Sequence, residues 1–345
     1  SLSDRFGRRP VILLSNLGLG LDYVFMAMAP SLGWLFAGRI VSGITSASIP
    51  TAYAYIADVT TPETRAKAYG LMGAAFGIGF IVGPAIGGLL GALGPRAPFW
   101  VAALFSLANA MYGFFVLPES HPATDRAAFS WKRANPAGSL KLLRSHPQLI
   151  GFGALHFFYN LAHQSLQSVF VLYAGYRYGW NTTQVGLSLG AVGVCFAAVQ
   201  GGLVGAVVKK FGERRSLLAG LAFGAIGFAI YGFAPTGGIF LIGVPIMSLW
   251  GLYGPASQGL MTRRVGRGQQ GALQGALSSV AMLTGMIGPY LFAETFAAFI
   301  GPLRQMNLPG APYLLAAALL VVACALAFRI TRDAVPVSVP ADAQG

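Results

Sequence analysis

The chain has 345 residues, of which 55% are hydrophobic and 10% are charged, and its mean hydropathy is +0.64. A typical soluble domain carries about 25% charged residues, so this composition excludes a water-soluble fold and favours a protein embedded in a lipid bilayer. The net charge of +13 indicates nucleic-acid binding only where the basic residues cluster.

Ten apolar runs are long enough for membrane helices, each of which needs roughly 20 residues. They lie at about 10–29, 32–57, 67–92, 98–117, 148–174, 183–208, 214–234, 237–262, 270–300 and 311–330. None shows the two-residue alternation that is typical of membrane β-strands. The sequence therefore predicts an all-α membrane protein.

The basic residues are distributed unequally over the loops that join these runs. When the loops are assigned to alternate sides, 19 of the 23 lysines and arginines fall on one side, and Arg96, Arg177 and Arg304 fall on the other. By the positive-inside rule the richer side is cytoplasmic. We expect a multi-pass protein of the bacterial inner membrane with a cytoplasmic C-terminus, and the dispersed charge argues against a nucleic-acid partner.

An internal repeat appears as three local matches with one offset of 205 residues. Phe6-Gly7 recurs as Phe211-Gly212, Gly70 as Gly275, and Gly83-Pro84 as Gly288-Pro289. A constant offset predicts two parallel halves. We assign residues 1–117 to the N-terminal half, 118–147 to a cytoplasmic linker, 148–332 to the C-terminal half and 333–345 to a tail. The same offset predicts two further helices ahead of residue 1.

Chemistry-bearing motifs are sparse. Cys195 and Cys324 lie in apolar runs and suit buried apolar positions, with no disulfide framework and no metal-ligand spacing. No phosphate-binding loop of the Gly-rich Lys-Ser/Thr type is present, which argues against ATP as the energy source. We therefore expect no enzyme activity, no catalytic residues, no metal and no cofactor.

Several segments resemble the major facilitator superfamily. SLSDRFGRRP matches the loop signature G-x-L-x-D-R-x-G-R-R from its second position, and GIGFIVGPAIGG matches the G-x-x-x-G-P-x-x-G-G signature of drug/proton antiporters. AGRIVSGITSASIPTAYAYIADVT, PRAPFW, FVLPESH and QQGALQGALSS resemble the tetracycline-resistance branch.

The resemblance implies a twelve-helix fold, of which this sequence holds ten helices. It also implies proton-coupled efflux of a small amphipathic compound, such as a tetracycline-like drug, by a monomeric carrier. Carriage of a metabolite, or a non-functional truncated carrier, are the alternatives. The branch carries a His on the eighth helix and an Asp on the ninth, and Phe196 and Gly224 occupy those places here.

Two groups of gating residues follow from the resemblance. Asp4, Arg8 and Asp58 would form a charge network that locks the cytoplasmic side, although topological anchoring or ordinary interfacial charge also accounts for them. Gly83 and Pro84 would form a hinge and seal, and plain tight helix packing is the alternative.

Asp22 and Arg39 are opposite charges inside the first helix pair, at similar distances from the turn at Pro30-Ser31. Since a charge inside a bilayer usually faces a partner or a water-filled cavity, they form either a structural ion pair or part of the substrate and proton pathway.

A polar stripe provides further pathway candidates. Asn160, His163, Gln164 and Gln167 share one helix face by their spacing. The stripe either lines a cavity or hydrogen-bonds neighbouring helices, and His163 is the candidate proton carrier. Gln200, which matches the branch, joins this set. Glu294 is either a second proton carrier or an interfacial charge.

Overall fold

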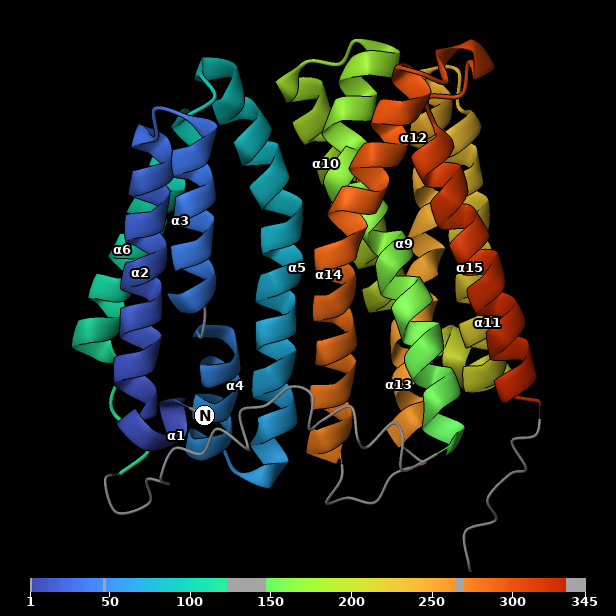
Figure 1. Cartoon of the computed structure of the whole chain (residues 1–345). Helices are drawn as coiled ribbons and strands as arrows, with labels where there is room; N and C mark the ends of the chain where they lie inside the picture. The colour runs from blue at the N-terminus through green and yellow to red at the C-terminus, as the bar shows by residue number, and fades with distance from the viewer. Residues whose placement is uncertain (1, 46–47, 123–146, 263, 265–269, 333–345) are drawn as a thin grey trace, which may run out of the picture. The chain divides into compact units, whose positions relative to one another are not determined.

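The computed structural model describes residues 2–45, 48–122, 147–262, 264 and 270–332. Within these ranges the regular structure is helical, with no strand (Figure 1). The predicted all-α class is confirmed. The predicted tail and most of the predicted linker lie outside the described residues.

The described chain forms these helices in order: α1 (Leu2–Phe6), α2 (Arg8–Met28), α3 (Leu32–Thr45), α4 (Ser48–Val59), α5 (Pro62–Leu93), α6 (Ala97–Val116), α9 (Pro147–Tyr178), α10 (Thr182–Ala198), the π-helix η2 (Val199–Leu203), α11 (Val204–Phe233), α12 (Gly237–Ser248), the 3₁₀ helix η3 (Leu249–Leu252), α13 (Tyr253–Thr262), α14 (Gln270–Ile300), the 3₁₀ helix η5 (Arg304–Met306) and α15 (Ala311–Ile330).

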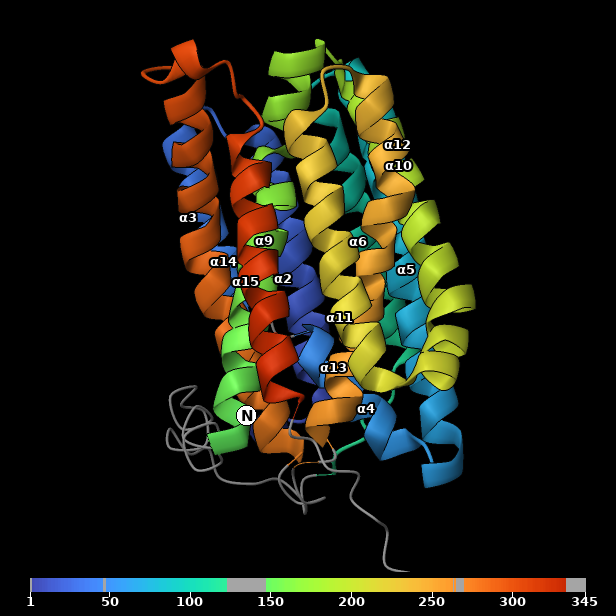
Figure 2. The same ribbon diagram turned by 90° about the vertical axis from the view of Figure 1, so that its right-hand side faces the viewer.

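These helices belong to two compact units. The first comprises residues 1–135 and 181–193, and the second comprises 136–180 and 194–345. In the first unit α2 packs against α6, α3 and α4. In the second unit α9 packs against α14 and α15, and α11 packs against α15, α12 and α13, as Figure 2 shows for α11 and α15.

Two of the predicted spans are interrupted. The run at 183–208 passes from α10 through the π-helical turn η2 into α11. The run at 237–262 passes through the 3₁₀ turn η3 between α12 and α13. Average hydropathy does not detect such breaks, because it reflects composition and not backbone geometry.

One matched pair of the predicted repeat, Gly7 and Gly212, has the same backbone conformation. Gly7 precedes α2 with φ 97° and ψ 161°, and Gly212, 205 residues later, has φ 79° and ψ 163° inside α11. Side-chain-bearing residues rarely adopt this conformation. The glycine at each place therefore turns the chain into the following helix in the same way.

The outer surface is apolar to a degree that water would not tolerate. Phe105, Phe115 and Val321 are 68%, 77% and 59% exposed, and many other large apolar side chains are similarly open. Six helical stretches within the described residues are long and apolar enough to cross a bilayer. Large contiguous apolar surfaces mark membrane or partner contacts, so lipid is the solvent that this surface fits.

Candidate functional site

The first candidate site is an ion pair at the start of α2. The guanidinium of Arg8 donates from Nε to Oδ2 of Asp58 at 3.0 Å, and from Nη1 to the hydroxyl oxygen of Ser3 at 2.8 Å. Arg8 is only 7% exposed. The structure thus brings together two of the three predicted gating charges. Asp4 belongs to α1, but its side chain lies outside what the structure describes.

Glu119 joins this site although the sequence analysis gave it no role. Its Oε1 accepts the backbone N–H of Arg8 at 2.9 Å and that of His121 at 3.0 Å. The cap residue of α2 is Gly7, which offers no side-chain acceptor. A carboxylate therefore satisfies a free N–H at the positive end of the helix. Its segment, FVLPESH, was the only sequence signal.

Asp22 and Arg39 meet inside the first unit, as their depths predict. Oδ2 of Asp22 lies 3.5 Å from Nη2 of Arg39. Asp22 is 6% exposed, and neither of its carboxylate oxygens has a hydrogen-bond partner in the described structure. Arg39 also donates from Nε to the sulfur of Met26 at 3.1 Å. The pair is long and incompletely satisfied, which suits a carboxylate that exchanges partners.

On α5, Gly88 lies against the backbone of α10, and Gly91 lies against the side chain of Thr182. A Cβ at Gly88 would lie 2.6 Å from the Cα of Gly186 and 2.9 Å from the carbonyl oxygen of Thr182. A Cβ at Gly83 would meet nothing within 4 Å, and Pro84 lies inside the helix. Both glycines of the contact belong to the first unit, so α5 touches α10 backbone to backbone beside the predicted hinge.

The polar stripe of α9 faces several different neighbours. Asn160 donates to the carbonyl oxygen of His156 in its own helix at 2.8 Å. The His163 ring lies 5.6 Å from the Trp250 ring. Gln164 packs on Gly288 of α14, since a Cβ added to Gly288 would lie 2.4 Å from the Gln164 Cβ. Gln167 is exposed. Two of the four side chains, those of His163 and Gln164, therefore contact neighbouring helices.

An aromatic cluster fills the centre of the second unit. Trp250 of η3 lies 4.7 Å from Tyr159 and 5.3 Å from Phe228, centroid to centroid. A Cβ at Gly224 would stand 2.7 Å from Cδ1 of Trp250. A side chain at Gly224, the position that we aligned with the aspartate of the resembling branch, would therefore meet the Trp250 indole.

Gln200 lies in the π-helical turn η2, which breaks the α-helix between α10 and α11. Its Nε2 donates to the carbonyl oxygen of Gly251 at 3.4 Å. A Cβ at Gly251 would come within 3.1 Å of the Phe196 ring. π-Turns recur at functional sites, and this one holds Gln200 against the break between α12 and α13.

Comparison with known proteins places the chain among transporters. The model of the Major Facilitator Superfamily matches residues 1–289. The class C tetracycline resistance protein of Escherichia coli is 39% identical over 298 residues, which cover 86% of this chain and 75% of that protein. The class G protein of Vibrio anguillarum is 39% identical over 306 residues, covering 87% and 76%.

Solved structures agree on the fold. A bacterial homologue of the human lysosomal transporter Spinster, in an inward-facing and unoccupied conformation, superposes with a TM-score of 0.76 at 17% identity, over 96% of this chain and 84% of that one. The human organic anion transporter MFSD10 gives a TM-score of 0.69 at 24% identity, over 94% and 78%.

Proposed function

This chain belongs to the major facilitator superfamily and is a multi-pass inner-membrane transporter, and from that premise we propose that it exports a small amphipathic antibiotic in exchange for protons. Tetracycline is the first compound to test, because the relatives named above are tetracycline resistance proteins. The binding site would open to one side of the membrane at a time, so that substrate and proton cross in opposite directions.

The observation that carries this proposal is the ion pair that Arg8 of the DRFGRRP segment makes with Asp58 of α4. A gate must be stable in one conformation and breakable in another, and it must bias that equilibrium by a few kcal/mol. Arg8 supplies such a contact, because its buried guanidinium joins α1 to α4 and its backbone N–H binds the segment after α6. Linker and C-terminus would then lie in the cytoplasm.

The proton route of this protein would differ from that of the resembling branch. Gly224, which packs against Trp250, aligns with the aspartate of that branch, so the second unit would use another group or none. We propose Asp22 in the first unit and His163 in the second as the proton carriers. Asn160, Gln164, Gln167 and Gln200 would hydrogen-bond the substrate.

The test is tetracycline uptake into inverted membrane vesicles from a drug-sensitive host. We expect uptake that depends on an imposed proton gradient and that an uncoupler abolishes. His163→Ala should remove the dependence on the gradient, whereas His121→Ala, outside the membrane-spanning helices, should retain it. Uptake that ignores the uncoupler would contradict proton exchange, and the absence of uptake across a panel of antibiotics would contradict drug export.

A further inference from the structure

A groove on α14 carries an acidic side chain, Glu294. Its volume is about 670 Å³, and all its lining residues come from α14: Met286, Ile287, Tyr290, Leu291, Glu294, Thr295, Ala298 and Phe299. This volume lies within the range of about 300–1,000 Å³ that is usual for small-molecule sites.

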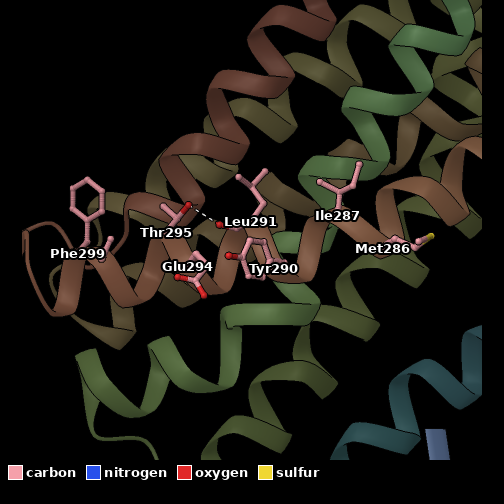
Figure 3. A pocket seen from close by; sticks show the side chains of 8 residues that line it. Met286, Ile287, Tyr290, Leu291, Glu294, Thr295 and Phe299 are labelled. Carbon is pink, nitrogen blue, oxygen red and sulfur yellow. Dashed lines mark hydrogen bonds between the residues drawn. The ribbon is translucent and has the colours of Figure 1, made fainter. Parts of the chain in front are cut away.

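The lining residues form two rows along the helix, each with a spacing of four residues. One row contains Met286, Tyr290 and Glu294, and the other contains Ile287, Leu291, Thr295 and Phe299, as Figure 3 shows. Residues four apart share one face of a helix. A molecule that lies along the groove therefore contacts thioether, aromatic and aliphatic groups over most of its length.

The polar groups of the groove are few. The Thr295 hydroxyl already donates to the carbonyl oxygen of Leu291 at 2.7 Å. Glu294 is exposed, as is Tyr290, at 72%. Within the described part of the chain Glu294 has no ion-pair partner. Its carboxylate is therefore the one charge in the groove.

Glu294 also lies within the apolar stretch Gly275–Ile300, which is long enough to cross a bilayer. It stands six residues before the end of α14, which corresponds to about 9 Å along the helix axis. An unpaired carboxylate at this depth is costly and calls for a counter-charge. A divalent metal ion is a poor fit, because it needs several oxygen ligands and the described residues hold no group of three candidate ligands.

We propose that this groove binds an amphipathic organic cation, with the Glu294 carboxylate as its counter-ion. The apolar body of the ligand would lie along Met286, Ile287 and Leu291. The face of Tyr290, next to the carboxylate in Figure 3, would add a cation–π contact. The inference deepens the proposed function, on which it rests, by naming the charge of a substrate.

The experiment is equilibrium binding of tetraphenylphosphonium to the purified full chain, with protein-free micelles as the blank. Glu294→Gln keeps the shape of the side chain and removes its charge, and Glu294→Asp keeps the charge. We expect Glu294→Gln to weaken binding at least about tenfold and Glu294→Asp to weaken it less than about threefold. Tyr290→Ala should weaken binding by an intermediate factor.

Tetraphenylborate, an anion of almost the same shape, is the matched control ligand. Its binding should be weaker than that of the cation and should not fall in Glu294→Gln. Equal binding of both ions to the unmodified protein, unchanged cation binding in Glu294→Gln, or no cation binding at all would each overturn the proposal.

This measurement is independent of the vesicle test. Cation binding that requires Glu294 in a protein that does not carry tetracycline would retain the groove and reject the proposed drug. Tetracycline exchange in a protein that binds no cation would retain the proposed drug and reject the cation site in the groove.

Discussion

At the scale of single residues, Arg8 holds three segments through different atoms. Its Nε, Nη1 and backbone N–H meet Asp58, Ser3 and Glu119 respectively. The planar guanidinium reaches Asp58 and Ser3 with two separate nitrogens, whereas lysine offers a single ammonium nitrogen. We predict that Arg8→Ala lowers the free energy of unfolding by about 3 kcal/mol, because it leaves a partly buried carboxylate unpaired, and that Arg8→Lys restores only part of the loss.

Arg9 provides the matched control for Arg8. It donates to the carbonyl oxygen of Phe114 at 2.7 Å and stacks on the Phe114 ring, and among the described residues it has no carboxylate partner. Arg9→Ala should therefore cost less, about 1 kcal/mol. Thermal unfolding of the purified variants measures both. Equal losses of unfolding free energy in Arg8→Ala and Arg9→Ala would contradict a larger stabilising role for Arg8.

Asp22 and Arg39 present the choice between a structural and a functional pair. If the pair is structural, Arg39→Gln should destabilise by leaving Asp22 buried without a counter-charge, and the double variant with Asp22→Asn should recover about 1–3 kcal/mol. If the pair lies on the pathway, as proposed, both single variants and the double variant should lose transport with little change in stability. Thermal unfolding and vesicle uptake of all three variants decide between the two.

The pairs Arg8–Asp58 and Asp22–Arg39 could be anticipated from the sequence, because the motif or the common depth of opposite charges identified both partners. Glu119 could not, since it lies 111 residues from the N–H that it accepts. The position of Trp250 against Gly224 was equally hidden. Such contacts depend on how distant segments pack, and neither hydropathy nor spacing contains that information.

At the scale of elements, α5 shows what a run of small residues does and does not reveal. The spacing of its glycines predicted that α5 approaches a neighbouring helix closely. Which glycines make that contact depends on the position of the partner helix. Gly88 meets Gly186, while Gly83 faces open space. The register between α5 and α10 determines which glycine makes the contact, and that register cannot be read from the sequence of α5 alone.

The third prediction follows from that register. Gly88→Ala should push α5 and α10 apart, since the new Cβ would lie 2.6 Å from backbone that has no rotamer to change. A loss of about 1–3 kcal/mol is expected for such overpacking. Gly83→Ala is the control, and it should be neutral or slightly stabilising, because alanine favours the helix. Differential scanning fluorimetry of both variants tests the pair, and a larger loss for Gly83→Ala would reverse the assignment.

At the scale of the whole molecule, the alternation of loops that the arginines predicted agrees with contacts inside each unit. In the first, Arg96 donates to the carbonyl oxygen of Ala29 at 3.0 Å, which joins two loops assigned to the same side. In the second, Arg214 donates to Thr331 at 3.1 Å, and Tyr178 donates to the carbonyl oxygen of Ala234 at 3.1 Å. Each bond joins ends that the charge distribution had assigned to one side.

The last prediction concerns which side is which. Arg96 and Arg304 belong to the arginine-poor side and Lys209 to the arginine-rich side. With Cys195 and Cys324 first replaced by alanine, Arg304→Cys should react with a membrane-impermeant maleimide in intact cells, and Lys209→Cys should react only after permeabilisation. Positive charge resists translocation during insertion, so the rich side stays in the cytoplasm. Labelling of Lys209→Cys in intact cells would invert the topology and the direction of transport proposed from it.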